Sequence, residues 1–431
     1  MLVRQLPFMS RPHAWVELRA WALMAVPMGM LSGGVTGVLV NTVYADVIST
    51  WALGLAVAVV TGAGPLANLF SVLWSHWSQG RDKIALLTRM QAAYGLCIAV
   101  CAAAPLNSLG LLVLVGGLLG AQILWCGIIT VRGSVWRANY SRGARTLFAA
   151  RNQIFVSVCV SLTGATAGLM LDIKLETFRW LFIVASLFAF GSLSMLRRVK
   201  VRRQRQLLNA EQQLANGQTF RPREFLAILR EDALFRTYMI WMMVFGSGNL
   251  MTTALLILVM TNHLNMPGLS QVMITAAVPT LLMAFTTPFW GRVLASRHVI
   301  AFRAINSRVF VGAMLAFFSG ATLAFPPLLW LGAVLLGMAM GGGLLGWNLG
   351  HNDFASQARV TEYLGLHVTL TGIRGLLAPL IGVGLYSVLE RAQPGAGVWA
   401  LALPLILTSS GSLGFNWLKR NVALRESASL D

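Results

Sequence analysis

The chain has 431 residues, of which 57% are hydrophobic and 11% are charged, and its formal net charge is +19. Soluble domains carry about 25% charged residues, so this composition excludes an ordinary soluble protein. Nucleic acid is excluded as a partner because the basic residues flank apolar runs of roughly 20 residues, the length that crosses a bilayer. We therefore expect a protein whose surroundings are the lipid bilayer.

The apolar runs predict twelve transmembrane helices, because backbone groups in hydrocarbon must be hydrogen-bonded within their own segment. The predicted spans are 20–43, 51–75, 84–104, 108–131, 149–171, 178–196, 234–260, 269–291, 301–324, 327–349, 361–388 and 397–418. The first apolar run begins near Trp21 and is too long for the apolar part of a signal peptide. We expect it to remain as the first span.

Lys and Arg residues are unevenly distributed over the gaps between these spans. All but four of the 33 fall in every second gap or in the helix turns that border it, with both tails included. The exceptions are Lys174, Arg179 and Arg391, in the opposite gaps, and Arg374, inside a span. Because loops rich in Lys and Arg stay in the cytoplasm, we expect both termini to be cytoplasmic and the membrane to be the cytoplasmic (inner) membrane.

A hydrophilic stretch separates the first six spans from the last six. The predicted divisions are a tail 1–19, a six-helix bundle 20–196, a basic linker 197–233, a second six-helix bundle 234–418 and a tail 419–431. We interpret the linker as a tether rather than a domain. Its basic cluster at 197–205 is a candidate site for anionic lipid headgroups, and a charge run that only sets the topology is the simpler interpretation.

The two halves resemble each other at the loops that follow spans two and eight. Trp74 precedes Arg81 by the same number of residues as Trp290 precedes Arg297. The loops after spans four and ten match at nearly the same offset. This repetition predicts two parallel six-helix repeats with a substrate site between them, near the middle of the membrane.

Twelve spans, a six-plus-six division and basic loops after spans two and eight resemble the major facilitator superfamily. In that family these loops carry a glycine, an Asp-Arg pair, a second glycine and two basic residues. The matching positions, which we take as conformational-loop candidates, are Gly80, Arg81 and Lys83 in the first copy and Gly291 and Arg297 in the second. Trp77 and Ala295 stand at the acidic position, so the cytoplasmic latch that this acid helps to form is in doubt here.

The resemblance implies an all-α polytopic membrane protein with two six-helix bundles related by pseudo-two-fold symmetry. It also implies a secondary-active or facilitative transporter that moves a small solute by alternating access, as a monomer and without a cofactor. We find no catalytic motif and no metal-ligand spacing. The alternatives are a receptor or assembly scaffold of the same fold that has lost transport, and a polytopic membrane enzyme.

Arg374 is the basic residue that topology does not explain. Arg374 lies near the centre of the span 361–388. Inserting an unpaired Arg there costs a free energy of roughly 3 kcal/mol on insertion scales, so its side chain should face protein or a water-filled cavity. A guanidinium binds carboxylate or phosphate in a fork, which makes Arg374 a candidate contact for an anionic or zwitterionic solute. The alternative is a structural Arg held by carbonyls or hydroxyls of neighbouring helices. No carboxylate is evident within the spans.

Other polar residues within the spans complete the candidate sites. The further substrate-binding candidates are Ser32, Gln122, Trp125, Asn249 and Thr371. Asn249 follows two glycines, which predicts a broken or water-facing helix. The coupling candidates are Asp46, Arg132 and His367: Arg132 lies near an Arg that the family's proton-coupled exporters use, and His titrates near neutrality. An interhelical hydrogen bond, a topology charge or a solvated loop acid is the simpler interpretation.

Two further patterns concern packing and bending. The glycines at 341–343 predict close helix packing within span ten. Pro27, Pro65, Pro279 and Pro379 are predicted flex points, because neighbouring groups can satisfy the backbone that a proline frees.

Overall fold

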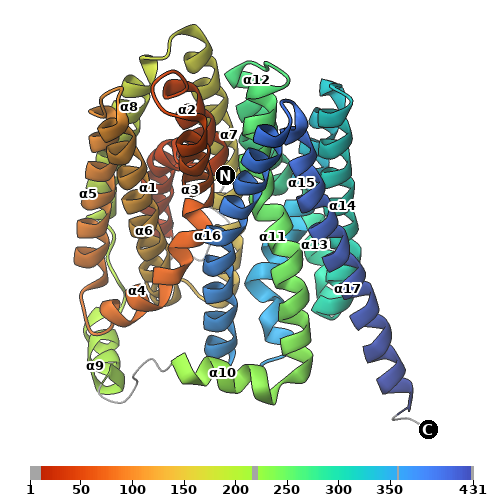
Figure 1. Ribbon diagram of the computed structural model, residues 1–431. Coiled ribbons are helices and arrows are strands. Elements are labelled where there is room, and N and C mark those ends of the chain that lie inside the picture. Colours follow the sequence, from red (N-terminus) through yellow and green to blue (C-terminus); the bar gives the residue numbers. More distant parts are fainter. Residues whose placement is uncertain (1–10, 216–221, 357–358, 429–431) are drawn as a thin grey trace.

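The computed structural model describes residues 11–215, 222–356 and 359–428. In this part of the chain, eleven helices are long and apolar enough to cross a membrane, and the bent pair α1–α2 makes a twelfth. Figure 1 shows two bundles side by side, the first coloured red to yellow and the second green to blue. The predicted all-α fold with twelve spans is confirmed.

The two bundles are built from consecutive parts of the chain. The first consists of α1 (Arg11–Met30), α2 (Gly33–Val43), α3 (Thr50–Ala67), the 3-10 turn η2 (Asn68–Phe70), α4 (Ser71–Ser78), α5 (Lys83–Ala102), α6 (Ser108–Asn139), α7 (Arg142–Ile173) and α8 (Thr177–Leu196). The second consists of α11 (Ala233–Asn262), α12 (Gly268–Val272), the π-helical turn η3 (Met273–Ala277), α13 (Val278–Ala295), α14 (Val299–Thr322), α15 (Pro326–Leu349), the 3-10 turn η4 (Gly350–Asp353), α16 (Val360–Ala392), the 3-10 turn η5 (Ala396–Leu401) and α17 (Ala402–Ala428).

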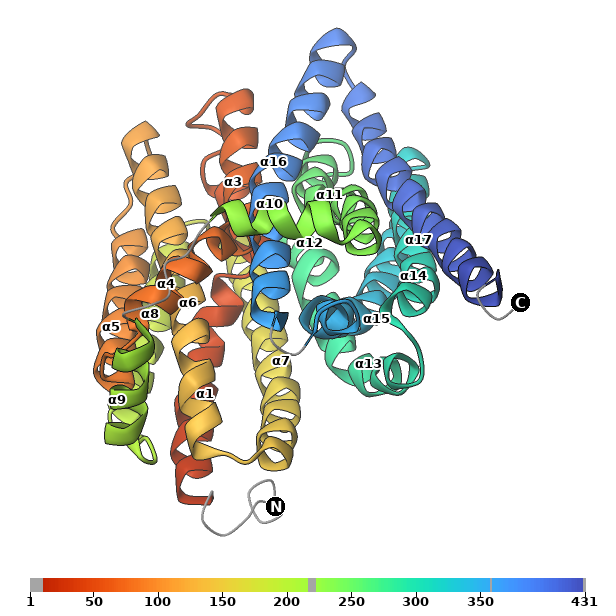
Figure 2. The same cartoon turned by 90° about the horizontal axis from the view of Figure 1, so that it is seen from below.

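The predicted tether contains two helices, α9 (Gln204–Ala215) and α10 (Pro222–Glu231). Both lie beyond one end of the bundles (Figure 1), which we call the linker end; the opposite end is the far end. Seen from the linker end, α9 lies with the first bundle and α10 lies across α11 and α16 (Figure 2). Each helix of the linker is therefore attached to a different bundle.

The first span is broken, although its sequence predicts one continuous run. Its two parts, α1 and α2, meet at an angle of 43°. The amide of Gln122 donates a hydrogen bond to the carbonyl of Leu31 at this break, over 2.8 Å. A 3-10 turn follows Pro65 and a π-helical turn precedes Pro279, whereas Pro379 lies within the continuous α-helix α16.

Small residues let the two bundles approach closely along α3 and α16. A Cβ atom on Gly62 would lie 2.3 Å from the carbonyl oxygen of Gly375, and one on Gly375 would lie 2.5 Å from Pro65. Within the second bundle, a Cβ on Gly341 would lie 2.5 Å from Thr286 Oγ1, and one on Gly342 would lie 2.3 Å from Asn306 Nδ2. The predicted role of the glycines in span ten is confirmed, because only a residue without a side chain permits such contact.

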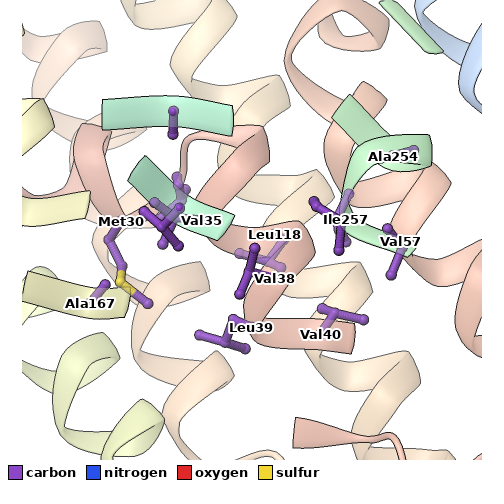
Figure 3. Close-up of a cluster of buried hydrophobic side chains, with 14 of the residues drawn as sticks. Met30, Val35, Val38, Leu39, Val40, Val57, Leu118, Ala167, Ala254 and Ile257 are labelled. Atoms are coloured by element: carbon purple, nitrogen blue, oxygen red, sulfur yellow. The ribbon is translucent and has the colours of Figure 1, made fainter. Parts of the chain in front are cut away.

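A continuous apolar cluster crosses from one bundle to the other in the far half. Figure 3 shows Val38 and Val40 of α2 together with Val57 of α3 and Ile257 of α11. Among the eleven spans other than the bent α1–α2 pair, α11 is the most enclosed, with 67% of its most apolar stretch buried, whereas only 28% of that stretch of α6 is buried. Lipid tails are as apolar as these side chains, so tight van der Waals packing holds the helices together.

Hydrogen bonds between the bundles lie in the far half wherever the structure describes them. The Asn41 amide donates to Thr261 Oγ1 over 2.8 Å, and the Ser161 hydroxyl donates to the Ala277 carbonyl over 2.9 Å. The carboxylate of Asp172 accepts from the backbone N–H groups of Gly268 and Leu269, at 2.6 and 2.9 Å. The bundles are thus joined at the end opposite the linker.

Candidate substrate and coupling sites

A cavity of about 240 Å³ lies in the first bundle at the break between α1 and α2. Three of the predicted substrate-binding residues, Ser32, Gln122 and Trp125, line it together with Thr61 and Tyr94. None of the described residues around this cavity is charged. The site therefore offers hydroxyl, amide and aromatic groups to a ligand.

The helix break determines how these side chains are presented. Because the Gln122 amide nitrogen is engaged by the Leu31 carbonyl, its carbonyl oxygen remains on the side of Gly64, whose Cβ would lie 3.8 Å away. Trp125 is held against Tyr94, with ring centroids 5.9 Å apart. The hydroxyl oxygen of Ser32 is buried and has no hydrogen-bond partner among the described residues. A ligand can therefore satisfy Ser32 and Gln122 and stack on Trp125.

Arg374 and Thr371 lie outside this cavity, between α16 and α11 of the second bundle. The guanidinium of Arg374 donates to the carbonyl of Met242 through Nη1 and to the Thr371 hydroxyl through Nη2, over 3.1 Å. Its side chain fills the space beside Gly246, where a Cβ would lie 2.1 Å from Nη1. A carbonyl and a hydroxyl thus hold Arg374, as expected for a structural arginine. A role for Arg374 in substrate binding stays a prediction.

Asn249 lies on an unbroken helix, so the predicted break in α11 is wrong. Its amide donates to the carbonyl of Phe245 on its own helix, over 2.9 Å. The neighbouring glycines make room for other side chains: a Cβ on Gly248 would lie 2.5 Å from Thr408 Oγ1, just as Gly246 receives Arg374. The glycines here serve packing, and the break falls in the first bundle instead.

The coupling candidates are far apart from one another. Asp46 is exposed in the turn after α2, at the far end. His367 is 3% exposed inside the second bundle, where its ring lies 5.7 Å from that of Trp347. Arg132 is half-buried in the first bundle, with its guanidinium 3.7 Å from the centre of the Trp21 ring.

A buried carboxylate lies beside Arg132, which contradicts the expectation that the spans contain none. Glu17 is 3% exposed and accepts hydrogen bonds from the Trp136 indole and from the Tyr140 hydroxyl, the latter over 3.1 Å. Helix α1 begins at Arg11, well before the predicted start at residue 20, and this places Glu17 within the helix. Glu17 and Arg132 share the lining of one small cavity.

The first conformational loop is bound by the linker. Gly80 has a φ of 66°, a backbone conformation that favours glycine. The N–H of Gly80 and the Nζ of Lys83 both donate to the same carboxylate oxygen of Glu211 in α9, over 2.9 and 2.5 Å. Arg81 stacks on Trp77 with its guanidinium carbon 4.7 Å from the ring centre. A carboxylate of α9 thus binds this loop at Gly80 and Lys83.

The second conformational loop shows no such contact in the part of the chain that the structure describes. Gly291 faces Leu345, and Arg297 is exposed. The repeat itself is confirmed at the two tryptophans that precede Arg81 and Arg297 by seven residues. The indole of Trp74 donates to the carbonyl of Ile123 over 3.0 Å, and that of Trp290 donates to the carbonyl of Met338 over 2.7 Å.

The sequence profile of the Major Facilitator Superfamily matches residues 21–379. The chain belongs to the major facilitator superfamily. It is therefore a transporter of small solutes, and members of this superfamily are normally not enzymes. No curated protein matches the chain.

Solved structures of other transporters share the fold. The nucleoside transporter NupG superposes with a TM-score of 0.73 at 10% identity, covering 94% of this chain and 99% of its own. The xylose transporter XylE from E. coli, in an inward open conformation, gives 0.70 at 10%, covering 94% and 95%. The POT family transporter PepTSo gives 0.69 at 12%, covering 97% and 99%. At these identities the likeness shows the superfamily fold alone.

Three charged residues are buried or bound although the sequence predicts them to be exposed. From the sequence, Glu17 belongs to the tail, Glu211 to the tether and Arg303 to the charges of the loops. Arg303 is 2% exposed in α14. A signal for it exists, because Asn306, Ser307 and Phe310 lie on the same helical face and are also buried.

Proposed function

We propose that the protein carries a small polar solute across the cytoplasmic membrane by alternating access, and that this solute binds in the cavity at the α1–α2 break. The observation that carries the proposal is the chemistry of the cavity wall. Ser32 and Gln122 offer hydrogen bonds and Trp125 offers a flat apolar face, without any charged group. An uncharged solute with several hydroxyl or carbonyl groups fits such a site.

The positive charges support the orientation of the transporter. Lys and Arg concentrate in the loops and helices of the linker end, which favours a cytoplasmic position for that end and for both termini. The hydrogen bonds between the bundles lie at the far end. In this orientation the described conformation is closed toward the outside.

The Gln122→Leu variant tests the site. We expect an affinity loss of about tenfold or more, because the variant removes a hydrogen bond to the solute, and tenfold corresponds to about 1.4 kcal/mol. A ligand-stabilisation screen over sugars, nucleosides and small amides identifies the solute, and titration of purified wild type and variant measures its affinity.

Gln271→Leu is the matched control, because Gln271 is also buried and its amide donates to a backbone carbonyl, that of Met266, over 2.8 Å. It lies outside the cavity, so solute affinity should be unchanged. Equal affinities for wild type and Gln122→Leu would refute this location of the site. If no solute exchanges in counterflow although the protein is folded, a receptor or scaffold role is favoured instead.

Arg374 favours a second substrate class, an anionic or zwitterionic solute. Its Nε is buried without a partner among the described residues and is available to an anionic group. The same screen therefore includes carboxylates and phosphates. Arg374→Ala should abolish binding of such a solute and leave binding of an uncharged solute unchanged; normal binding of the anion would show that Arg374 is structural.

We propose that Glu17 and Arg132 couple transport to protons. A buried carboxylate beside a guanidinium can exchange a proton as the conformation changes. In proteoliposomes, Glu17→Gln should lose accumulation driven by a proton gradient and should retain counterflow, which needs no gradient. Glu176→Gln, at an exposed glutamate, is the control. Retained accumulation in Glu17→Gln would exclude this role, and Asp46→Asn and His367→Gln test the other two predicted coupling residues in the same assay.

A further inference from the structure

Five buried polar side chains converge in the linker-side half of the second bundle. They come from four elements: Tyr238 from α11, Arg303 from α14, His351 from η4, and His367 and Arg374 from α16. Each is at most 6% exposed. Each also has one buried nitrogen or oxygen atom without a hydrogen-bond partner among the described residues, namely Tyr238 Oη, Arg303 Nε, His351 Nδ1, His367 Nε2 and Arg374 Nε.

The end of α15 brings these groups together. A Cβ on Gly346 would lie 2.8 Å from the guanidinium carbon of Arg303, and one on Gly350 would lie 3.4 Å from Tyr238 Oη. Trp347, between these glycines, packs against His367 and donates from its indole to Thr371 Oγ1 over 3.1 Å. The same hydroxyl accepts from Arg374. Glycines at this turn thus leave space that the basic side chains occupy.

The cluster is positive and has no acidic counterpart in the part of the chain that the structure describes. The basic groups that act on His367 are Arg374, Arg303 and His351, and Arg303 also acts on Arg374. The nearby acids are engaged elsewhere. Asp232 accepts from Tyr363, Asp353 accepts from the N–H of Val299, and Glu362 pairs with Arg359. Arg303 lies against Gly346, and Arg374 shares the Thr371 hydroxyl with Trp347, so both guanidinium groups lie beside the same turn of α15 without a carboxylate.

Backbone carbonyls accept some of the hydrogen bonds that the two guanidinium groups can donate. The Met242 carbonyl accepts from Arg374, and the Gly343 carbonyl lies 3.4 Å from Arg303 Nη2, near the limit of a hydrogen bond. A carbonyl satisfies a donor but does not neutralise a charge. Buried charges in proteins are normally paired, and the cost of leaving two like charges unpaired is large. An anion would neutralise the charge and accept from the free donors at once.

We propose that this cluster binds a small anion between Arg303 and Arg374, with further contacts from His367, His351 and Tyr238. The ligand is either an inorganic anion or the acidic group of a solute. The site lies in the second bundle, apart from the uncharged cavity at the α1–α2 break. It does not depend on where an uncharged solute binds, and for the acidic group of a solute it rests on the role proposed above for Arg374.

The test uses the purified full-length protein in sodium HEPES buffer, whose only anion is a bulky sulfonate that contains no carboxylate or phosphate. Sodium chloride, bromide, nitrate, phosphate or acetate is titrated in, and the melting temperature is measured. We expect a saturable rise of several degrees for wild type and at least a tenfold weaker response for Arg303→Gln and for Arg374→Gln. Arg308→Gln is the matched control, since Arg308 lies on the same helix but is exposed and bonded to Asn416. It should respond as wild type does.

The pattern of effective anions distinguishes the two sources. Saturation by chloride, bromide or nitrate identifies an inorganic-anion site, whereas a response confined to phosphate or acetate identifies the acidic group of a solute. No saturable response to any of the five salts, or equal responses in wild type and both Arg variants, would overturn the proposal.

A second measurement applies if the Arg variants fail to fold. Bromide bound in the cluster lies close to Trp347 and should quench its fluorescence saturably. The saturable component should be present in wild type and absent from Trp347→Phe. If both proteins are quenched equally, bromide does not bind at this cluster and the inorganic-anion source is excluded; if phosphate and acetate also leave the melting temperature of wild type unchanged, the proposal is wrong.

Discussion

Replacing Gly62 by leucine is expected to abolish transport and to destabilise the closed arrangement of the bundles by about 3 kcal/mol or more, at the upper end of overpacking effects. A Cβ at this position would lie 2.3 Å from the carbonyl oxygen of Gly375. The obstacle is backbone on both sides, so no rotamer change relieves it. Solute counterflow and the melting temperature of the purified variant measure the two effects.

Gly384→Leu is the control for this prediction. Gly384 lies on α16, as Gly375 does, but a Cβ there would meet no atom within 4 Å. We therefore expect normal folding and transport for Gly384→Leu. Wild-type transport by Gly62→Leu would show that α3 and α16 do not pack in this way in the functional protein.

The second large effect is expected for Glu211→Ala, at the contact between α9 and the loop before α5. Lys83 is 2% exposed, and its Nζ lies 2.5 Å from the Glu211 carboxylate, which is 19% exposed. Removing one partner of a buried ion pair costs about 3–5 kcal/mol, and the partial exposure of Glu211 places this variant near 3. Thermal unfolding should show the loss, and protease cleavage in the linker should become faster.

The exposed pair Lys174–Glu176 provides the comparison, because its two side chains are 67% and 65% exposed. Solvent screens such a pair, so Glu176→Ala should leave the melting temperature unchanged. Replacing both members of the buried pair, as Lys83→Met with Glu211→Leu, should recover part of the lost stability. If Glu211→Ala melts like the wild type, α9 is not anchored by this ion pair.

The spans and the repeat were accessible from the sequence because each depends on a local pattern. A run of apolar residues predicts a span by its length alone, and Trp74 and Trp290 occupy equivalent positions next to basic loops. The structure gives these two indoles equivalent hydrogen bonds. The break after Met30 has no such pattern, since Gly33 and Gly248 each follow a serine and only the first lies at a break.

The missed residues depend on contacts over long separations. Glu17 is buried by Trp136 and Tyr140, 119 and 123 residues further along the chain. Glu211 reaches Lys83 across 128 residues. In each case the side chain is charged and lies in a hydrophilic segment, so its local sequence predicts exposure. Its burial follows from the packing of other helices, which a single sequence does not show.

The two linker helices also limit how far the transporter can move. Helix α9 is held to the first bundle by Glu211, and α10 is held to the second by Ile228, whose side chain is fully buried in the core of that bundle. Residues 216–221 connect them, and a chain of this length reaches at most about 25 Å when fully extended. As long as both helices stay attached to their bundles, this short connection limits the distance between the end of α9 and the start of α10. It therefore also limits how far the two bundles can separate at the linker end.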